Sequence, residues 1–215
     1  MARQRTYDDT LRDRLIDEAA QVIADHGVQA LSVRDVAMRA GTTTNAIYTF
    51  FGSRGSLVAE VVAKADQSFV QAHREAAGEG ADLLDLYRIG KAYVTWAVEF
   101  PTMYVILTDR AGARLDPPPW APHIEHGSSD EGAPIVRTVA RLMAEGVLTA
   151  GDPVLVSTYL WAGVHGYVEI LRMLDGQEPA GYDLVEYLHA LIAPWVAHDA
   201  DGHPVVDLDE VGRGV

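Results

Sequence analysis

The stretch AGTTTNAIYTFFGSR, residues 40–54, has polar side chains at its start and apolar side chains after them. Threonine is a mediocre helix former, so three of them at a helix start indicate hydroxyl groups kept for a purpose other than helix propensity. Hydroxyl and amide groups donate and accept hydrogen bonds, and they could therefore bind a polar partner. The candidate binding residues are Thr42, Thr43, Thr44, Asn45, Tyr48 and Thr49. Simple capping of a solvated helix is the alternative role for the threonines.

A second set of candidate residues is aromatic or sulfur-containing and lies in the later part of the chain. Its members are Tyr93, Trp96, Phe100, Met103, Tyr104, Trp120, Met143, Trp161 and His165. Trp161 and His165 are four residues apart, as are Trp96 and Phe100, so each pair shares a helix face. Such residues either pack an ordinary core or line an apolar pocket in which one polar group, here His165, orients a ligand.

Other chemistry has little support in the sequence. The chain has no cysteine, which excludes disulfides, thiol nucleophiles and cysteine-based zinc sites. A metal-like cluster in a proline- and glycine-rich loop has no fixed geometry; it consists of His123, Glu125, His126 and Asp130. GSRGS lacks the spacing of a nucleophile elbow, and GEGADLL lacks the third glycine of a dinucleotide fingerprint. We expect no metal, no cofactor and no enzymatic activity; a helical enzyme with the aromatic residues as its active site is a distant alternative.

The elements that carry the threonines are expected to be three helices. Residues 10–26 have apolar side chains at helical spacing, and Ser32 with Asp35 has the pattern of a capping box at the start of a second helix. That helix stops at Gly41. The buried stripe of the third helix consists of Ile47, Phe50 and Phe51. Two short helices separated by a glycine turn and braced by a longer one are the parts of a helix-turn-helix.

Longer helices are expected after this region, and no alternating strand pattern is present. Their expected ranges are Ser53 to a break at Gly78 and Gly80, Asp82 to Phe100, a helix from near Ala133, a helix with Asp152 as N-cap and Pro153 in its first turn, and Asp183 to His198 with a kink at Pro194. The prolines at 117–119 mark a loop. The fold class is all-α, with an N-terminal helix-turn-helix domain over 1–55, a larger helical domain over 56–198, and an acidic, flexible C-terminal tail over 199–215.

The net charge of −14 is distributed unevenly along the chain. Residues 1–55 hold seven arginines and seven acids, so this part is neutral and the later part carries the whole negative charge. Binding to a phosphate backbone is therefore compatible with the first part of the chain. The N-terminus has no apolar signal region, and no run of 18 apolar residues is present. We expect a soluble cytoplasmic protein with no membrane partner.

Residues 10–60, centred on SVRDVAMRAGTTTNAIYTFFGSRGSLVAEV, resemble the DNA-binding domain of the TetR family of transcriptional regulators. FPTMYVIL resembles the segment at the sixth helix of many members. EGVLTAGDPVLVSTYLWAGVHGYVEIL resembles the Trp-His-Gly element of one C-terminal subgroup. The resemblance implies a homodimeric repressor that binds a palindromic operator in double-stranded DNA and releases it when a small molecule binds the later domain.

Within such a domain the polar residues would have specific roles. A recognition helix enters the major groove by its N-terminal end, where Thr43 and Thr44 can reach phosphates or base edges and Asn45 can pair with adenine. Tyr48 would reach a phosphate, as the family pattern also implies. Arg34 would contact a base or a phosphate, and Arg54 would clamp a phosphate. Thr44 and Thr49 stand where many members have lysine and histidine, so the recognition helix carries no positive charge.

The resemblance also assigns roles in the later domain. The family makes an apolar effector pocket of this region, here expected from Trp96, Phe100, Met103, Tyr104, Trp120, Met143, Trp161 and His165. The effector would be a small apolar or aromatic molecule. The last two long helices would form a four-helix dimer bundle through Gly163, Gly166, Leu184, Leu188, Leu191 and Trp195. A regulator whose body only dimerises, with no ligand, is the main alternative.

Overall fold

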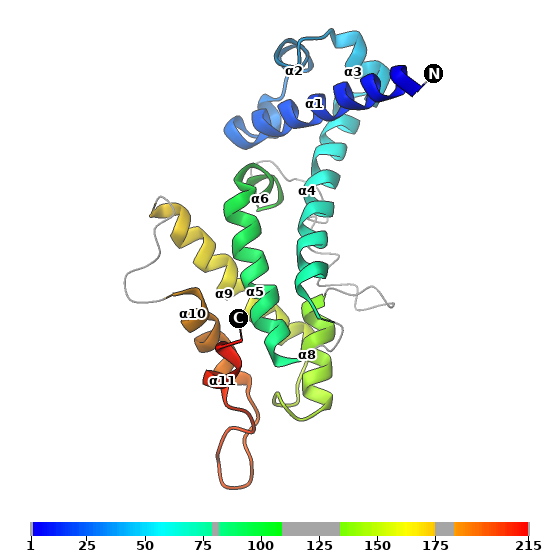
Figure 1. The fold of residues 1–215 in the computed structure, drawn as a ribbon. Coiled ribbons are helices and arrows are strands. Elements are labelled where there is room, and N and C mark those ends of the chain that lie inside the picture. Colours follow the sequence, from blue (N-terminus) through cyan, green and yellow to red (C-terminus); the bar gives the residue numbers. More distant parts are fainter. Residues whose placement is uncertain (1, 79–81, 109–133, 175–182, 215) are drawn as a thin grey trace. The chain divides into compact units, whose positions relative to one another are not determined.

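A computed structural model describes residues 2–78, 82–108, 134–174 and 183–214, with side chains from Asp9 onward. Helices are the only elements of regular secondary structure among these residues, which confirms the all-α prediction (Figure 1). The α-helices are α1 (Ala2–His26), α2 (Val33–Arg39), α3 (Thr44–Phe51), α4 (Arg54–Ala76), α5 (Leu83–Glu99), α6 (Pro101–Thr108), α8 (Pro134–Ala144), α9 (Pro153–Met173), α10 (Leu184–Ile192) and α11 (Leu208–Gly212). Two 3₁₀ turns, η1 (Val28–Ala30) and η2 (Ala193–Trp195), complete the set.

The chain divides into two compact units. The described residues of the first unit are 2–68 and 100–108, and those of the second are 69–99, 134–174 and 183–214. The division falls inside α4, whereas the sequence suggested a boundary at 55. The first turns of α4 belong with the helix-turn-helix because Leu57, Val61 and Ala65 are fully buried on one face of the helix.

The helix-turn-helix of the first unit is built around Gly41. This glycine has a φ of 67°, in the left-handed region that glycine adopts without strain. The amide of Thr42 donates to the carbonyl of Ala37, and the amide of Gly41 donates to that of Met38, which is the hydrogen-bond pattern of a Schellman motif. The motif ends α2 and directs the chain into α3, as the sequence predicted.

Three local details of the first unit differ from the prediction. The first helix begins at Ala2 rather than at residue 10. The capping box at the start of α2 is not formed, because the side chain of Ser32 makes no capping hydrogen bond. Ile47 and Phe51 are buried as expected, while Phe50 is only half-buried.

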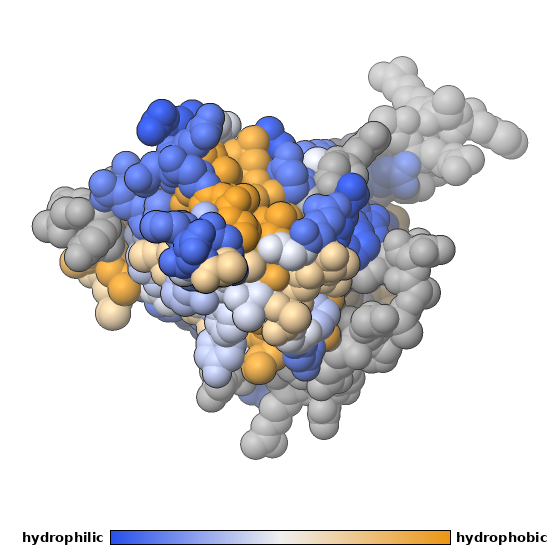
Figure 2. Space-filling model, turned by 90° about the horizontal axis from the view of Figure 1, so that it is seen from below, coloured by the Kyte–Doolittle hydropathy of each residue, from blue (hydrophilic) through white to orange (hydrophobic). Residues whose placement is uncertain are grey.

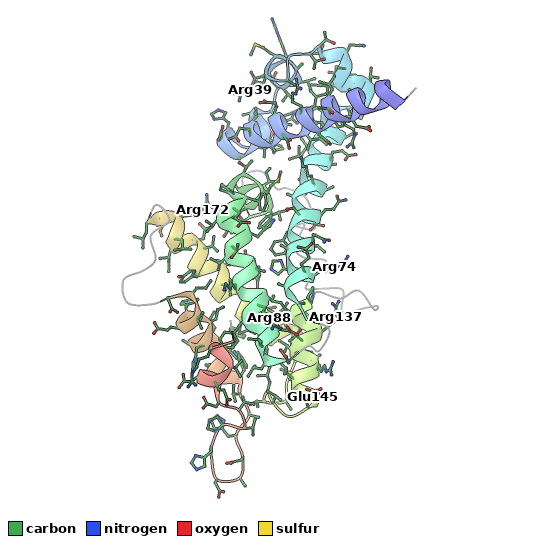
Figure 3. The ribbon with its side chains drawn as sticks, in the orientation of Figure 1. Arg39, Arg74, Arg88, Arg137, Glu145 and Arg172 are labelled. Atoms are coloured by element: carbon green, nitrogen blue, oxygen red, sulfur yellow. The ribbon has the colours of Figure 1, made fainter. Side chains whose placement is uncertain are left out.

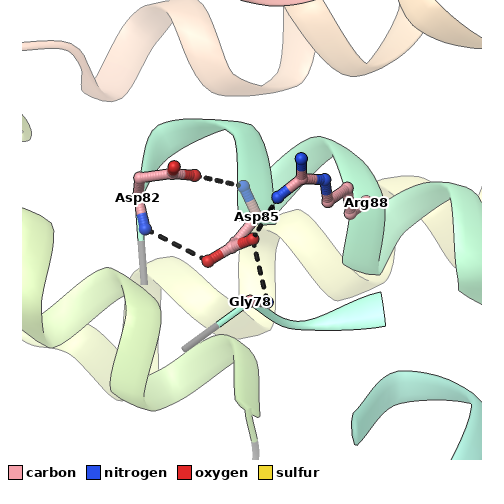
Figure 4. Close-up of polar contacts among 4 residues, drawn as sticks. All are labelled: Gly78, Asp82, Asp85 and Arg88. Atoms are coloured by element: carbon pink, nitrogen blue, oxygen red, sulfur yellow. Dashed lines mark hydrogen bonds and ion pairs between the residues drawn. The ribbon is translucent and has the colours of Figure 1, made fainter. Parts of the chain in front are cut away.

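A capping box is present elsewhere, at the start of α5 in the second unit (Figure 4). The Oδ1 of Asp82 accepts from the amide of Asp85 at 3.0 Å, and the Oδ2 of Asp85 accepts from the amide of Asp82 at 3.1 Å. The Oδ1 of Asp85 also accepts from the amide of Gly78 and from Arg88, at 2.9 and 3.0 Å. This buried carboxylate ties the end of α4 to α5, and a Cβ at Gly78 would lie 2.7 Å from it.

The other helix starts of the second unit follow the sequence closely. Asp152 caps α9 by accepting from the amides of Val154 and Leu155, and Pro153 occupies the first turn, as predicted. Asp183 caps α10 by accepting from the amide of Glu186. Helix α9 packs against α5, α8 and α10, which places it at the centre of the unit.

The described part of the acidic segment 199–215 packs against the second unit, where the sequence suggested a flexible end. Helix α10 ends at Ile192, so Pro194 lies in the 3₁₀ turn that follows it rather than in a kinked helix. The chain then pairs with the loop after α8, where the amide of Thr149 donates to the carbonyl of Trp195 and that of Ala197 donates to Val147. Helix α11 packs on α5 and α10, with Leu208 buried. Apolar residues within the acidic segment account for this order.

Candidate DNA-binding and effector sites

Helix α3 separates a buried face from an exposed polar face. Ile47 and Phe51 are 0% and 8% exposed. The predicted contact residues lie on the outside: Thr43, Thr44, Asn45, Tyr48 and Thr49 are exposed, and Thr42 is half-buried. The side chain of Tyr48 is 52% exposed.

The threonine hydroxyls at the start of α3 are not used for capping. Thr43 is the N-cap residue, yet its side chain makes no capping hydrogen bond. The hydroxyl of Thr49 donates to the carbonyl of Asn45 at 2.9 Å and so has a local role. The structure therefore argues against simple capping as the purpose of Thr43, and leaves its hydroxyl exposed beside the helix N-terminus, where amides and the helix dipole favour anions.

Most of the basic side chains described in the first unit already have partners. Arg39 pairs with Asp35 at 3.0 Å on α2 (Figure 3), and Arg14 reaches the carbonyl of Ala40 at 3.5 Å. Two pairs join α1 to α4: Arg12 with Glu60 at 2.8 Å and Lys64 with Asp17 at 2.5 Å. Arg34, in contrast, is exposed on α2 and forms no ion pair with the described residues.

Arg54 is directed toward the protein. Its Nε donates to the carbonyl of Leu31 at 2.9 Å, and its Nη2 donates to the carbonyl of Val28. These two carbonyls belong to the first residue of the turn η1 and to the residue that follows it, between α1 and α2. The arginine predicted to clamp a phosphate is thus half-buried against its own chain.

An aromatic network joins three helices of the second unit. The Phe69 ring of α4 lies 5.2 Å from Trp96 and 5.5 Å from Tyr93, both on α5. Tyr93 in turn contacts His165 on α9, and His165 stacks on Trp161 with ring centroids 5.1 Å apart. The structure thus brings together four residues singled out from the sequence: Tyr93, Trp96, Trp161 and His165.

Polar groups within the network are hydrogen-bonded. The hydroxyl of Tyr93 and Nδ1 of His165 are 3.0 Å apart. Burial lowers the pKa of His165 below 6.5, with Glu169 acting in the opposite direction and Arg172 adding to the decrease. Arg172 and Glu169 form an ion pair at 3.2 Å near the end of α9 (Figure 3). His165 is therefore a neutral imidazole at pH 7.

The sequence prediction missed two members of this network, Phe69 and His73. They lie four residues apart on α4, with ring centroids 4.0 Å apart, and Nδ1 of His73 is 2.8 Å from the carbonyl of Phe69. His73 is 8% exposed and lies 5.9 Å from Tyr93. The spacing of an aromatic and a histidine in QSFVQAHREA was the available signal.

The remaining predicted effector residues that the structure describes lie on other parts of the chain. Phe100, Met103 and Tyr104 are in the first unit, where Phe100 is 44% exposed and Tyr104 is buried. Met143 is half-buried on α8. Trp120, the prolines at 117–119 and the metal-like cluster of His123, Glu125, His126 and Asp130 lie outside the described residues. Within the described residues, no group of three or more His, Asp or Glu side chains could hold a metal ion.

Several residues predicted for the dimer interface pack within one chain instead. A Cβ at Gly163 would lie 2.5 Å from Cδ2 of Leu191, and Tyr187 donates from its hydroxyl to the Gly163 carbonyl at 3.0 Å. Leu188 is 2% exposed and packs on Gly90. Gly163, Leu188 and Leu191 thus hold α9, α10 and α5 together in the monomer. Leu184 and Trp195 are half-buried, and Gly166 faces open space.

The opposite side of α9 exposes large apolar side chains at helical spacing. This α9 outer stripe consists of Leu155, Tyr159, Gly166, Ile170 and Met173; the four larger residues are 40–73% exposed. The Trp195 ring lies 5.7 Å from Tyr159 and borders the stripe. Seen from below, the surface also has hydrophobic residues gathered into a patch with hydrophilic residues along its border (Figure 2). Contiguous apolar surface of this kind marks an interaction site.

Helix α9 is also the one helix among the described residues that is long and apolar enough to cross a membrane. Its other face, however, carries buried residues that include Val156, Leu160, Val164 and Val168. Because these side chains pack on neighbouring helices, α9 has the pattern of a core helix with one apolar outer face.

Comparisons with known proteins cover both units. Residues 15–61 match the family described as bacterial regulatory proteins, tetR family, and residues 86–193, half of the chain, match the tetracyclin repressor-like C-terminal domain. The HTH-type transcriptional repressor KstR2 of Rhodococcus jostii is 34% identical over 71 residues, which are 33% of this chain and 35% of KstR2. The chain thus spans about a third of that relative's length.

Solved structures show the same fold. A TetR family transcription regulator from Marinobacter aquaeolei has a TM-score of 0.71 at 16% identity, with 90% of this chain and 100% of that chain covered. SmeT, the repressor of a Stenotrophomonas maltophilia multidrug efflux pump, has a TM-score of 0.67 at 18% identity in its complex with triclosan, with 92% of this chain and 96% of that chain covered.

Proposed function

Because the chain belongs to the TetR family of bacterial regulatory proteins, we propose that it is a dimeric repressor that releases its DNA operator when a small molecule binds the second unit. The observation that carries the DNA-binding part is the exposed polar face of α3. The exposed residues of this face are Thr43, Thr44, Asn45 and Tyr48, and the side chain of Thr43 makes no capping hydrogen bond. On the opposite face, Ile47 and Phe51 are buried and pack the helix against the rest of the domain. A surface that is polar, rigidly held and uncommitted suits recognition of base edges and phosphates.

The operator would be bound with few ionic contacts. Arg12, Arg39 and Lys64 have carboxylate partners, and Arg54 is bound to backbone carbonyls. Arg34 and Arg14 are the exposed arginines without a carboxylate partner among the described side chains of the first unit, and Arg14 lies 3.5 Å from the carbonyl of Ala40. Each phosphate neutralised contributes about −0.9 to the slope of log K against log salt, so a shallow salt dependence is expected. Neutral donors on α3 would supply most of the contacts.

The dimer would form through the α9 outer stripe. The partner is a second copy of the chain, since one recognition helix alone binds weakly and a twofold operator needs two. Gly166 allows close approach at the middle of the stripe, and Tyr159 and Ile170 flank it with apolar area. An isologous contact of this stripe with itself brings α9 of each protomer against α9 of the other.

The effector would be a small aromatic or apolar molecule without a net charge. Phe69 and Trp161 are half-buried rings that the ligand would contact, while Trp96 is buried against Phe69. The hydrogen-bonded pair of Tyr93 and the neutral His165 supplies the polar atoms of this region. Helix α4 carries Phe69 in the second unit and pairs through Glu60 and Lys64 with α1 in the first. A ligand that binds one conformation of α4 better than another lowers DNA affinity by that difference, typically about 1–3 kcal/mol.

A fluorescence anisotropy titration on a selected duplex tests the proposal. Thr43→Ala and Tyr48→Phe should weaken binding while helix content and dimerisation stay unchanged, because neither side chain is in the core. Unchanged affinity in both variants would remove the assignment of α3.

Triclosan, the ligand in the SmeT complex, is the first effector probe. It should quench tryptophan fluorescence and release the duplex, and Trp161→Ala or His165→Ala should weaken release but leave DNA binding near the wild-type value. If these variants lose DNA affinity but the ligand still releases the duplex, Trp161 and His165 contribute only to packing of the protein core. If a panel of neutral aromatic compounds has no effect on DNA binding, the ligand-independent regulator is favoured.

A further inference from the structure

We infer that Arg54 is a positioning residue: it fastens the turn between α1 and α2 to the start of α4 and thereby orients α2 for DNA, without contacting a phosphate. The inference rests on the proposed DNA binding for its functional consequence, and on the contacts of one side chain for its geometry. Arg54 is the first residue of α4. Its guanidinium joins this helix to two carbonyls that precede it by 23 and 26 residues.

The geometry suits an arginine in particular. Nε donates to the carbonyl of Leu31 at 2.9 Å, and Nη2 donates to that of Val28. The planar guanidinium presents several donors in a fixed arrangement and stays charged, so it can bridge two acceptors on one turn. A guanidinium directed inward in this way has fewer donors left for an external phosphate.

Apart from Arg54, the turn is held by main-chain hydrogen bonds and by the buried side chain of Leu31, and no other side-chain hydrogen bond to it is among those described. It begins at Gly27, whose φ of 79° gives the backbone a conformation that other residues rarely adopt. Within it, the amide of Leu31 donates to the Val28 carbonyl at a long 3.3 Å. Ser32, which follows, gives no side-chain cap to α2. The charge-assisted hydrogen bonds from Arg54 are therefore the strongest polar contacts of this turn among those described.

Orientation of α2 matters because of what it carries. Arg34 lies three residues after Leu31 and is exposed for DNA. The first turns of α4 are also tied to α1 by the Arg12–Glu60 and Lys64–Asp17 pairs. Any displacement of α4 would therefore act on α1 through these pairs and on the start of α2 through Arg54.

The test compares Arg54→Ala and Arg54→Lys with Arg34→Ala, an exposed arginine of the same unit, as the matched control. Two readouts are combined: the salt dependence of DNA affinity, and hydrogen exchange of amides 28–34 in the free protein. We expect Arg54→Ala to weaken specific binding about tenfold or more with the wild-type salt slope, and to accelerate exchange in the turn. Arg34→Ala should reduce the slope by about 0.9 and leave exchange unchanged.

Arg54→Lys separates the two roles even if Arg54→Ala fails to fold. Lysine keeps the charge that a phosphate contact needs but loses the planar fork, so positioning predicts faster exchange and weaker binding in this variant. The inference would be overturned if Arg54→Ala reduced the salt slope of DNA affinity, Arg54→Lys restored it, and hydrogen exchange of amides 28–34 stayed unchanged in both variants. That result would indicate that Arg54 clamps a phosphate. Wild-type affinity in Arg54→Ala would also overturn it. If the wild-type protein does not bind DNA, the proposed function fails. The contact of Arg54 with the turn can still be tested, because hydrogen exchange is measured in the absence of DNA.

Discussion

A charge placed on the α9 outer stripe should abolish dimerisation without unfolding the chain. Tyr159→Glu is the sharpest variant, because Tyr159 is 58% exposed and its one ring contact among the described residues is with Trp195. The monomer therefore loses little from the substitution. Glutamate also keeps good helix propensity within α9.

The magnitude follows from the symmetry of the contact. Each substitution occurs twice in an isologous interface, so two tyrosines' worth of apolar burial, about 1.5–3 kcal/mol each, is lost. Two carboxylates would also have to be desolvated near each other, at a cost of several kcal/mol per ion. A total above about 4 kcal/mol raises the dimer dissociation constant at least about a thousandfold.

Sedimentation velocity over a concentration series measures this change, with circular dichroism to check the helix content. Val98→Glu is the matched control, since Val98 on α5 is also 58% exposed but lies off the stripe; it should remain dimeric. A Tyr159→Glu protein that dimerises with the wild-type constant would refute the assignment of the stripe. Charged variants of Leu188 are unsuitable for the purpose, because that side chain is in the monomer core.

Three further predictions concern the second unit. Gly163→Ala should lower the free energy of unfolding by about 1–3 kcal/mol through overpacking, whereas Gly166→Ala, in open space, should leave it unchanged or raise it by up to about 1 kcal/mol; urea titrations compare them. Tyr87→Phe should raise the free energy of unfolding by about 1 kcal/mol, because the buried hydroxyl has no hydrogen-bond partner among the described residues and burial raises the pKa of Tyr87 to about 12. Tyr187→Phe should lower the free energy of unfolding by about 1 kcal/mol, because it removes the hydrogen bond to the Gly163 carbonyl. The half-buried His165 has a lowered pKa, so the unfolded chain takes up the proton first and stability falls as pH decreases below about 6.5. Thermal unfolding from pH 7.5 to 5 should show a weaker pH dependence in His165→Gln.

The helix-turn-helix could be predicted in detail because its signals are local. Gly41 marks a turn that needs a positive φ, and Ile47 and Phe51 show one apolar face at helical spacing. The role of Arg54 could not be predicted in this way. Its partners, Val28 and Leu31, are more than twenty residues distant, and only the fold brings them within hydrogen-bonding distance.

The dimer surface illustrates a second limit of the sequence. Gly163 and Gly166 are three residues apart on α9, and both could permit close packing. Only the structure shows that Leu191 of the same chain packs against Gly163, while Gly166 faces outward. An apolar position in a helix indicates burial, but the sequence does not say whether the partner surface belongs to the same chain or to another.

Selection of duplexes from a randomised pool tests the central claim most directly. Wild-type protein and Tyr48→Ala are taken through the same rounds, and the enriched sequences are compared. The account predicts that the wild type enriches a site of two inverted half-sites about one helical turn apart, and that Tyr48→Ala loses most of this enrichment. An absence of sequence preference in the wild type, or an enrichment that is the same with and without the Tyr48 side chain, would contradict DNA recognition through α3.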